Sequence, residues 1–525
     1  MIQNVITARP RVTPLLQTFN QKRMNRRPFP GYNKDTPKET KNKGNLLPTL
    51  QGNLNNLCKI LIFWKGPGRM TWAFLVVSES FRHPGHTLIP TGKGGGGMEL
   101  LLVGAGLWLS AVTGFFPARR AGLVLRCTLG SLLPGGRRRR GRDGITPFQA
   151  VSTALAGTLG TGNIAGVATA IVAGGPGAVF WMWCSALLGM ATKYAEVLLA
   201  VEYRTRGRDG RWQGGPMDYM DRGLGMPFLA GVFCVLCVLA SFGIGNATQV
   251  GAVAQAMARD FSIPPLATGV VMALAAGLVM MGGLRRIGAF AQAFVPLMAV
   301  FYLGAGGLVL VKNAAMLPEA LGLILRCAFA PGAAAGGVAG YTVRQAVHYG
   351  VARGVFTNEA GLGSAPMAHA GAAAEGPVQQ GCWGIFEVFI DTVVMCGFTG
   401  LIILSSGDLW RSGLDGAALT SAVFAQALGP AGGWVVSLSI LFFAFSTVLG
   451  WGYYGERAVG WLLGERRGAV TAYRLCYLAV MVLAAPARLT LVWGLSDLLN
   501  GAMMVPNLIA VVALWRVVRR RTLEV

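Results

Sequence analysis

Charged residues are scarce in this sequence. Only 13% of its 525 residues are Asp, Glu, Lys or Arg, whereas 53% are hydrophobic. Soluble chains carry roughly 25% charged residues, so the shortage of charge excludes a soluble globular protein and indicates an integral membrane protein with many helices. The 75 glycines agree with this reading, because glycine is more frequent in membrane helices than in soluble ones.

Histidine and clustered cysteine are scarce as well. The chain has four histidines, and its nine cysteines are scattered mainly through apolar runs. Cys234 and Cys237 form a C-x-x-C, but it lies in an apolar segment without a nearby histidine, which favours two small core residues over a redox or zinc site. The sequence also lacks G-x-x-x-x-G-K-[ST], which excludes the motor of a P-loop pump. We find no nucleophile–base pair at membrane depth, which disfavours a membrane enzyme.

The positive charge has an uneven distribution. The formal net charge is +24, and residues 1–97 carry 15 Lys+Arg against 3 Asp+Glu, which is +12. The remaining 31 basic and 19 acidic residues supply the other +12. In this second part the arginines cluster at the ends of apolar segments, where positive charge sets the orientation of a membrane protein. We therefore expect a lipid bilayer as partner and no nucleic acid.

Residues 1–97 differ in composition from the rest of the chain. They are basic, rich in Pro and Asn, and contain no apolar run long enough to cross a bilayer. We predict that this part is disordered or an extraneous extension, with the natural start at Met98. Lys93 followed by 94–97, all glycine, is what a purine-rich ribosome-binding stretch before a start codon would encode. Finding peptides from before Met98 in the expressed protein would contradict this hypothesis.

From Met98 onward the sequence predicts a transporter domain, 98–525, with eleven apolar segments. Each is long enough to cross about 30 Å of hydrocarbon, although 471–485 is marginal. The first segment, 98–117, is followed by two sets of five. The first set, within 146–311, comprises 146–172, 177–201, 227–257, 264–282 and 287–311. The second set, within 331–518, comprises 331–366, 378–404, 417–454, 471–485 and 491–518.

The charges of the loops predict how the protein is oriented in the membrane. Those at 118–145, 202–225, 283–286 and 456–470 are basic, as is the tail with Arg516 and Arg519 to Arg521, whereas the alternate connections are short or nearly balanced. Because basic loops stay in the cytoplasm, we expect a multi-pass protein of the cell's inner (plasma) membrane with a cytoplasmic C-terminus.

One apolar segment contains residues that form helices poorly. In 146–172 the run Gly157-Thr158-Leu159-Gly160-Thr161-Gly162-Asn163 places three glycines and two threonines near the centre, and each interior glycine costs roughly 1 kcal/mol relative to alanine. In hydrocarbon an unwound backbone is tolerated only where it is buried in protein or lines a wet cavity. The run predicts a broken helix at mid-membrane, as in secondary transporters. The alternative is that these small residues merely let neighbouring helices approach closely.

A second interrupted segment lies at the start of the second set, at 354–364. Both sets of five therefore begin with a glycine-rich break. Because each set has an odd number of segments, the second must insert upside down relative to the first. Paired breaks in corresponding positions are the best sequence indication of an inverted-repeat transporter and of its binding site.

The run from Arg353 to Pro366, RGVFTNEAGLGSAP, is long and specific. Together with GTGNIAGVATAI (160–171), GGPGAVFWMW (174–183), GNATQ (245–249) and FAFSTVLGWGYYGE (443–456), it resembles the alanine/glycine:cation symporter family. The resemblance covers essentially all of 98–525 and none of 1–97. It implies a ten-helix inverted-repeat (LeuT-like) core with one extra N-terminal helix, and cotransport of alanine or glycine with sodium. Gly251 stands where the family usually has asparagine, which leaves the preferred substrate open, and Thr357 replaces a usual serine.

An amino acid held at mid-membrane needs donors for its carboxylate and acceptors for its ammonium. We expect backbone amides of the unwound Gly160, Thr161 and Gly162 to receive the carboxylate, because the N-terminus of a half-helix carries partial positive charge. Side-chain oxygens of Asn246 and Gln249, one turn apart, could receive the ammonium; an interhelical hydrogen bond is the alternative. The adjacent Asn163 is assigned to the same substrate site.

The sodium site is predicted where a later helix crosses the break. Hydroxyls of Ser446 and Thr447, with oxygens at the break from Thr161 and Asn163, would make an all-oxygen site for a small hard cation. The alternative is that each hydroxyl bonds back to its own helix.

Two aromatic residues are predicted to close the pocket. Trp451 lies one turn beyond Thr447, and with Phe356 it would restrict the substrate to small side chains; ordinary aromatic packing is the alternative. The polar residues of the second break, Thr357, Asn358 and Glu359, complete the predicted site.

Ionisable residues inside membrane segments are few and are functional hypotheses by default. Lys193 and Glu196 stand three residues apart, and we expect them to pair with each other near a helix end. Asp391 has no adjacent counter-charge; we expect hydroxyl groups to hold it in a structural role, with proton coupling as the alternative. Glu387 is the fourth such residue. His348 and His369 flank the second break without metal-ligand neighbours.

These observations predict a secondary active symporter that imports alanine or glycine with sodium by alternating access, without catalysis or a cofactor. Each charge that moves inward gains about 2.3 kcal/mol per 100 mV of membrane potential, which drives accumulation. The same fold with proton coupling or altered specificity is one alternative, and a passive channel or membrane enzyme is an alternative of another class.

Overall fold

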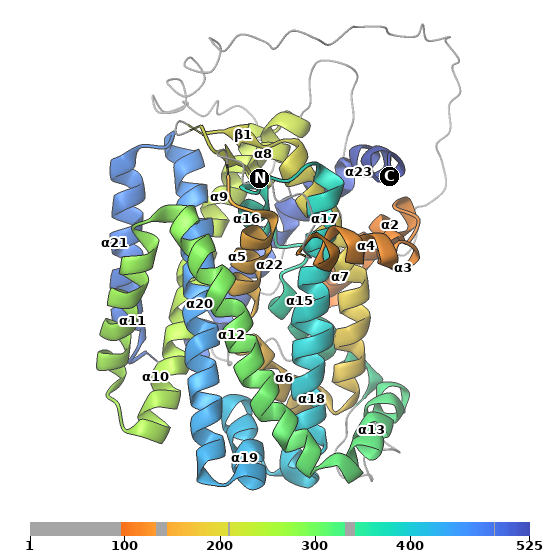
Figure 1. The fold of residues 1–525 in the computed structure, drawn as a ribbon, viewed down its shortest axis with the longest axis vertical. Helices are drawn as coiled ribbons and strands as arrows, with labels where there is room; N and C mark the ends of the chain where they lie inside the picture. Colours follow the sequence, from red (N-terminus) through yellow and green to blue (C-terminus); the bar gives the residue numbers. More distant parts are fainter. Residues whose placement is uncertain (1–95, 133–143, 208–209, 331–341, 488) are drawn as a thin grey trace, which may run out of the picture. The chain divides into compact units, whose positions relative to one another are not determined.

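A computed structural model describes residues 96–132, 144–207, 210–330, 342–487 and 489–525 of the chain. Nearly all of this part is helical, and its one sheet is a two-stranded hairpin in the loop after α7 (Figure 1). The hairpin pairs β1 (Thr205–Arg206) with β2 (Trp212–Gln213) in antiparallel register, with Thr205 opposite Gln213. The expectations for residues 1–95 lie outside the described residues. The start at Met98 stays a prediction.

The helices of the first part follow the predicted segments closely. The chain forms α2 (Gly96–Val112), α3 (Phe116–Arg119), α4 (Ala121–Cys127), η2 (Leu129–Leu132), α5 (Pro147–Thr158), η3 (Thr161–Asn163), α6 (Ala165–Gly174), α7 (Gly177–Glu202), α8 (Pro216–Asp218), η4 (Tyr219–Gly223), α9 (Pro227–Phe242), η5 (Gly243–Ala247), α10 (Thr248–Phe261), α11 (Pro265–Met280), α12 (Gly283–Lys312), η6 (Ala314–Met316) and α13 (Leu317–Phe329).

The second part contains the remaining helices. They are α15 (Val343–Asn358), α16 (Pro366–Ala370), α17 (Pro377–Val388), η7 (Phe389–Cys396), α18 (Gly397–Leu404), η8 (Asp408–Arg411), α19 (Gly416–Leu428), α20 (Pro430–Leu463), α21 (Arg467–Ala484), α22 (Leu489–Ala513) and α23 (Trp515–Leu523).

The length and composition of the helices agree with a multi-pass membrane protein. In the described part of the chain, seven helical stretches have at least 18 residues and are apolar enough to cross a bilayer. They are Gly177–Glu202, Pro227–Phe261, Gly283–Lys312, Pro377–Leu404, Pro430–Leu463, Arg467–Ala484 and Val492–Ala513. Other apolar helices, among them Glu99–Val112 and Ala165–Gly174, have only 10–17 residues.

Three predicted segments divide differently in the structure. The segment 417–454 is two helices, α19 and α20, because Gly429 turns with φ 74° and Pro430 starts a new helix. The segment 491–518 is divided between α22 and α23. Of the segment 331–366, residues 331–341 lie outside the described part, and α13 precedes it as a helix that the sequence analysis did not mark.

The interruption predicted in 146–172 is present. Helix α5 starts with a capping box between Thr146 and Gln149 and ends at Thr158. Gly160 is extended, with φ −130° and ψ −158°, and α6 starts only at Ala165. We call Leu159–Ile164 the first break. The prediction that this segment is not a continuous helix is therefore confirmed.

The second interrupted segment is shorter than predicted. Helix α15 continues through 354–358 and ends at Asn358, so we call Glu359–Ala365 the second break. Glu359 adopts the left-handed region with φ 54°, and Gly361 and Gly363 have φ of 92° and 79°. Glycine favours such values because it has no Cβ, which explains why this stretch leaves the helix.

Two long helices bring the breaks together. Helix α20 packs against α5, α9, α10 and α12, while α7 packs against α15 and α17 (Figure 1). Helices α5 and α20 cross at two glycines: a Cβ on Gly450 would lie 2.8 Å from the Cα of Gly157. This close crossing places the end of α5 against the middle of α20.

Candidate functional site

A cavity lies where the first break meets α20 and the second break. It encloses about 230 Å³ of empty space, part of which is open to solvent. Its walls are formed by Gly157, Thr158, Gly160, Gly162, Ile244, Gln249, Phe356, Thr357, Glu359, Thr447 and Trp451. Most of these residues belong to the predicted site, and they come together in one cavity although their segments are far apart in the sequence.

The amides of the first break are partly engaged by side chains. The Gly160 N–H donates to Oδ1 of Asn163 over 2.9 Å, and the Thr161 N–H donates to Oε1 of Gln249 over 3.3 Å. The Thr161 hydroxyl is buried and has no hydrogen-bond partner in the described part of the chain. The first break thus presents one unused hydroxyl, and the amides of Gly160 and Thr161 already have acceptors.

Asn163 lies behind the cavity wall and joins the first break to η7. Its Nδ2 donates to Oδ1 of Asp391 over 2.8 Å and to the Asp391 carbonyl over 3.1 Å, and it contacts Sγ of Cys396 at 3.3 Å. The second carboxylate oxygen of Asp391 accepts from the Thr392 hydroxyl over 2.8 Å. A hydroxyl and an amide hold Asp391, which agrees with the structural role expected for it.

Asn246 and Gln249 differ in position. Gln249 lines the cavity, and its Nε2 donates to the Ile244 carbonyl over 3.1 Å. Asn246 is fully buried outside the cavity wall, and its Nδ2 donates to the Tyr477 carbonyl over 2.7 Å. The interhelical hydrogen bond that was the alternative for Asn246 is therefore present, while its Oδ1 has no partner among the described residues. Gly251 is buried and is not part of the wall.

Ser446 and Thr447 lie against the carbonyl that ends α5. The Thr447 hydroxyl is 3.2 Å from the Leu159 carbonyl oxygen and 3.1 Å from that of Phe443. The Ser446 hydroxyl is 3.5 Å from Leu159 O and 2.8 Å from Phe443 O. Each hydroxyl thus bonds back to its own helix, which was the alternative, and also lies against the first break. The sodium site itself stays a prediction.

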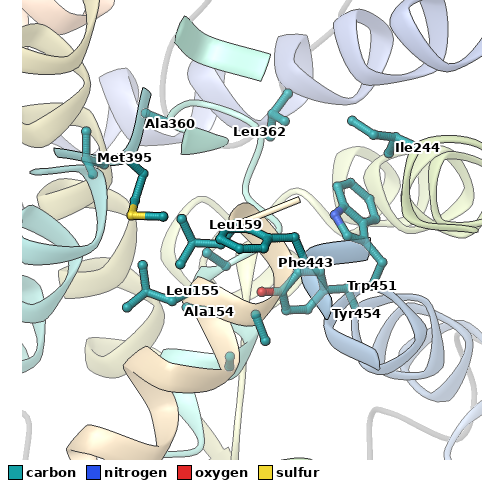
Figure 2. Packing of buried hydrophobic residues seen from close by; sticks show 14 of the residues in the cluster. Ala154, Leu155, Leu159, Ile244, Ala360, Leu362, Met395, Phe443, Trp451 and Tyr454 are labelled. Carbon is teal, nitrogen blue, oxygen red and sulfur yellow. The ribbon is translucent and has the colours of Figure 1, made fainter. Parts of the chain in front are cut away.

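Trp451 and Phe356 occupy different parts of the cavity wall. Trp451 is fully buried beside Tyr454, with ring centroids 5.7 Å apart, and Figure 2 shows both side chains with Phe443 on α20. Phe356 is half-buried, and its ring centroid lies 5.4 Å from that of Trp493. Both rings can restrict the size of a bound molecule.

The polar residues at the end of α15 and in the second break are held by specific bonds. Oε1 of Glu359 accepts from Nε1 of Trp451 over 2.7 Å, and Oε2 accepts from the Ser364 hydroxyl. Nδ2 of Asn358 donates to the Thr392 hydroxyl over 3.1 Å. The Thr357 hydroxyl donates to the Gly354 carbonyl over 2.9 Å. Of the three predicted residues, Thr357 and Glu359 reach the cavity and Asn358 does not.

The predicted pair of Lys193 with Glu196 is wrong. Nζ of Lys193 is 3.3 Å from Oε1 of Glu387 on α17, and Glu196 accepts from Nδ2 of Asn507 on α22. Because α7 is enclosed here by α17 and α22, each side chain finds a partner on another helix. His369 also contacts Glu387, which the sequence analysis did not anticipate because the two residues are 18 positions apart.

Several cavity residues were missed by the sequence analysis. Gly157, Thr158 and Ile244 line the wall, and all three lie close in sequence to residues that were named. The Leu159 carbonyl is a backbone group, so no residue type signals it. In the described residues, no group of three or more His, Cys, Asp or Glu could hold a metal ion, and Cys234 and Cys237 are buried free thiols.

Comparisons with known proteins identify the family of the chain. Residues 95–524 match the model of the sodium:alanine symporter family. An uncharacterised transporter of Haemophilus influenzae is 45% identical over 430 residues, which is 82% of this chain and 92% of the relative. The sodium/alanine symporter AgcS of Methanococcus maripaludis is 44% identical over 432 residues, 81% of this chain and 93% of the relative.

Among solved structures, a mutant of the manganese transporter of Eremococcus coleocola matches with a TM-score of 0.44 and 14% identity, covering 64% of this chain and 70% of the other. The family assignment rests on the sequence matches instead. They also confirm that the protein is a transporter and not an enzyme. The chain belongs to the sodium:alanine symporter family.

Proposed function

We propose that this protein imports a small neutral amino acid, alanine or glycine, together with sodium by alternating access. The observation that carries the proposal is a single cavity lined by both breaks, with Gly160 and Gly162 from the first, Glu359 from the second, and Thr357 from the end of α15. Interrupted helices at a cavity supply peptide groups that can hold a zwitterion and a cation without water. Such a site can open to either side when one set of helices moves against the other.

Sodium is proposed to bind between the first break and α20. The hydroxyls of Ser446 and Thr447 already lie within 3.5 Å of the Leu159 carbonyl oxygen. A hydroxyl that donates one hydrogen bond keeps acceptor lone pairs for a cation. The unpartnered Thr161 hydroxyl supports a fourth oxygen ligand from the break itself, and Asn163 acts through its bond to the Gly160 amide.

The amino acid is proposed to replace Gln249 at the first break. Its carboxylate would accept from the Thr161 N–H, to which Oε1 of Gln249 now serves as acceptor. The released Oε1 would then accept from the substrate's ammonium group. This exchange supplies partners for both ends of the zwitterion from one side chain and one amide. Trp451 and Phe356 would exclude large side chains.

The starts of the two interrupted helices support the proposed arrangement, in which two repeats of five helices follow the extra helix α2. Both interrupted helices begin in the same way, with a Thr-x-x-Gln capping box at Thr146–Gln149 for α5 and Thr342–Gln345 for α15. We therefore keep the eleven-helix, LeuT-like arrangement as part of the proposal. The basic loops favour a cytoplasmic C-terminus.

Alanine is the first substrate to test, because the relative from Methanococcus maripaludis is named a sodium/alanine symporter. Purified protein in proteoliposomes should concentrate labelled alanine when an inward sodium gradient is imposed, and not when choline replaces sodium. Competition by unlabelled glycine would measure the preference between the two. Uptake driven by a proton gradient without sodium would contradict sodium coupling, and equilibration without concentration would indicate a passive channel.

A further inference from the structure

A cluster of ionisable and polar side chains lies away from the cavity, between α7, α16 and α17. It contains Lys193, His369, Gln380 and Glu387, and we call these four residues the buried relay. All four side chains are fully buried. The proposed sodium and amino-acid sites do not use them. Burying so many polar groups is costly unless they are paired, so their bonding pattern matters.

The relay is a continuous chain of polar contacts. Nζ of Lys193 is 3.3 Å from Oε1 of Glu387, and the other oxygen of this carboxylate is 2.9 Å from Nε2 of His369. On the far side of the ring, Nδ1 of His369 is 2.7 Å from Nε2 of Gln380. An amide nitrogen only donates, so this orientation of Gln380 fits a ring whose Nδ1 accepts and whose Nε2 carries the hydrogen.

The side-chain amide of Gln380 could also support a second protonation state of His369. Its Oε1 is buried and has no hydrogen-bond partner in the described part of the chain. If the amide turned by half a rotation, Oε1 would face Nδ1 and accept a hydrogen bond from it. His369 would then carry a proton on each nitrogen, one donated to Gln380 and one to Glu387. The same heavy-atom positions thus accommodate both charge states of the ring.

The charges around the relay favour an added proton. The Lys193 ammonium interacts electrostatically with Glu387 and also with Glu196 and Glu359. Asp391 on η7 also faces Glu387, so four carboxyl groups lie around one ammonium group. Uncompensated buried charge is unfavourable, and a proton on His369 would offset one negative charge of this cluster.

Few other groups could compensate this charge. Tyr454 faces Glu359 and Glu387 and supplies no positive charge that could balance them. One oxygen of Glu196 has no partner among the described residues. Of the elements packed on α16, helix α5 contributes no ionisable residue. Helix α20 contributes Glu456, which pairs with Arg474, and Arg457, whose guanidinium faces Glu465 and donates to Gln213.

We propose that the buried relay is a proton-binding site, with Nδ1 of His369 as the atom that gains the proton. The chain reaches the protein surface six residues after His369, at Glu375, which is exposed. The relay is linked to the cavity by Glu359, which bonds Trp451. Protonation of the relay therefore changes the electrostatic field at the cavity without displacing sodium.

The first test uses the wild-type protein. It rests on the proposed function only because it takes alanine as the ligand. Alanine binding to the purified full-length chain in saturating sodium is measured by titration calorimetry in buffers of different ionisation enthalpy. We expect the observed enthalpy to depend on the ionisation enthalpy of the buffer, because the proton occupancy of the relay changes when alanine binds. Equal enthalpies in all buffers would overturn the proton site, whereas the absence of any alanine binding would instead contradict the proposed function.

The second test locates the proton. Initial rates of sodium-driven alanine uptake are compared between about pH 6 and about pH 8 in proteoliposomes with saturating sodium. For wild type we expect a change of about fivefold or more, and for His369→Gln a change of less than about twofold, with the sodium requirement retained. His348→Gln is the matched control, because His348 is partly exposed and pairs with Glu99 at 2.6 Å, outside the relay. A pH profile abolished by His348→Gln and kept by His369→Gln would overturn the assignment.

Discussion

Trp451 donates a hydrogen bond from its indole Nε1 to Oε1 of Glu359 over 2.7 Å. The two residues belong to α20 and to the second break, and both line the cavity. The same glutamate lies within the electrostatic reach of Lys193. The cavity wall is thereby coupled to the buried charges behind it, and this coupling is the basis of the first prediction.

Replacing Trp451 with alanine should widen the range of amino acids that compete with labelled alanine. The change removes the largest side chain of the wall, so larger side chains can enter. Trp451→Phe keeps most of the bulk but leaves Oε1 of Glu359 without its donor, which costs about 1–3 kcal/mol and should weaken transport without widening the range. Trp434→Ala on the same helix is the control, because Trp434 is 51% exposed. An unchanged competition profile for Trp451→Ala would contradict its role in the wall.

Thr447→Ala should raise the sodium concentration needed for half-maximal uptake by about tenfold, the effect of losing one buried oxygen partner. Thr447→Ser keeps the hydroxyl, so its half-maximal sodium concentration should stay close to that of wild type. Ser439→Ala serves as the matched control, since the Ser439 hydroxyl donates to Val435 O within α20. Sodium titrations of alanine uptake measure all three variants. If Thr447→Ala and Ser439→Ala behave alike, Thr447 does not bind the cation.

Gly450→Ala should destabilise the fold. Its Cβ would lie 2.8 Å from both Cα and N of Gly157, where backbone cannot move aside easily, and overpacking of this kind costs about 1–3 kcal/mol. Thermal unfolding of the detergent-solubilised protein would show a lower midpoint. Gly460→Ala on the same helix meets no atom within 4 Å, so its midpoint should stay near wild type. Equal midpoints for the two variants would mean that α5 and α20 cross less closely.

The bond between Asn163 and Asp391 predicts a rescue experiment. Asn163→Asp places two buried carboxylates side by side, which should reduce both the folded yield and transport. Adding Asp391→Asn restores one amide and one carboxylate with the positions exchanged, and Oδ1 at position 163 can still accept from the Gly160 amide. We expect the double variant to recover a large part of the folded yield. The single variant Asp391→Asn completes the cycle, and losses that simply add in the double variant would show that the pair has no direct coupling.

Much of the fold follows from local pattern. The apolar lengths predicted the long helices, and the glycine and threonine run predicted the first break, because these residues form helices poorly wherever they occur. The boundaries were less accurate. The α19–α20 division depends on Gly429 and Pro430, and the second break starts at Glu359, where left-handed backbone is held by contacts that the sequence does not display.

The sequence by itself determined that the protein crosses a membrane many times and that two helices are interrupted, because length, hydropathy and glycine content act locally. Only the tertiary structure decided which polar groups meet. Lys193 bonds Glu387 instead of the nearby Glu196, Asn163 reaches Asp391, and Leu159 offers a backbone oxygen to Thr447. The physical reason is that a buried polar group takes the partner that packing brings within reach, and packing between helices distant in sequence is set by the fold as a whole.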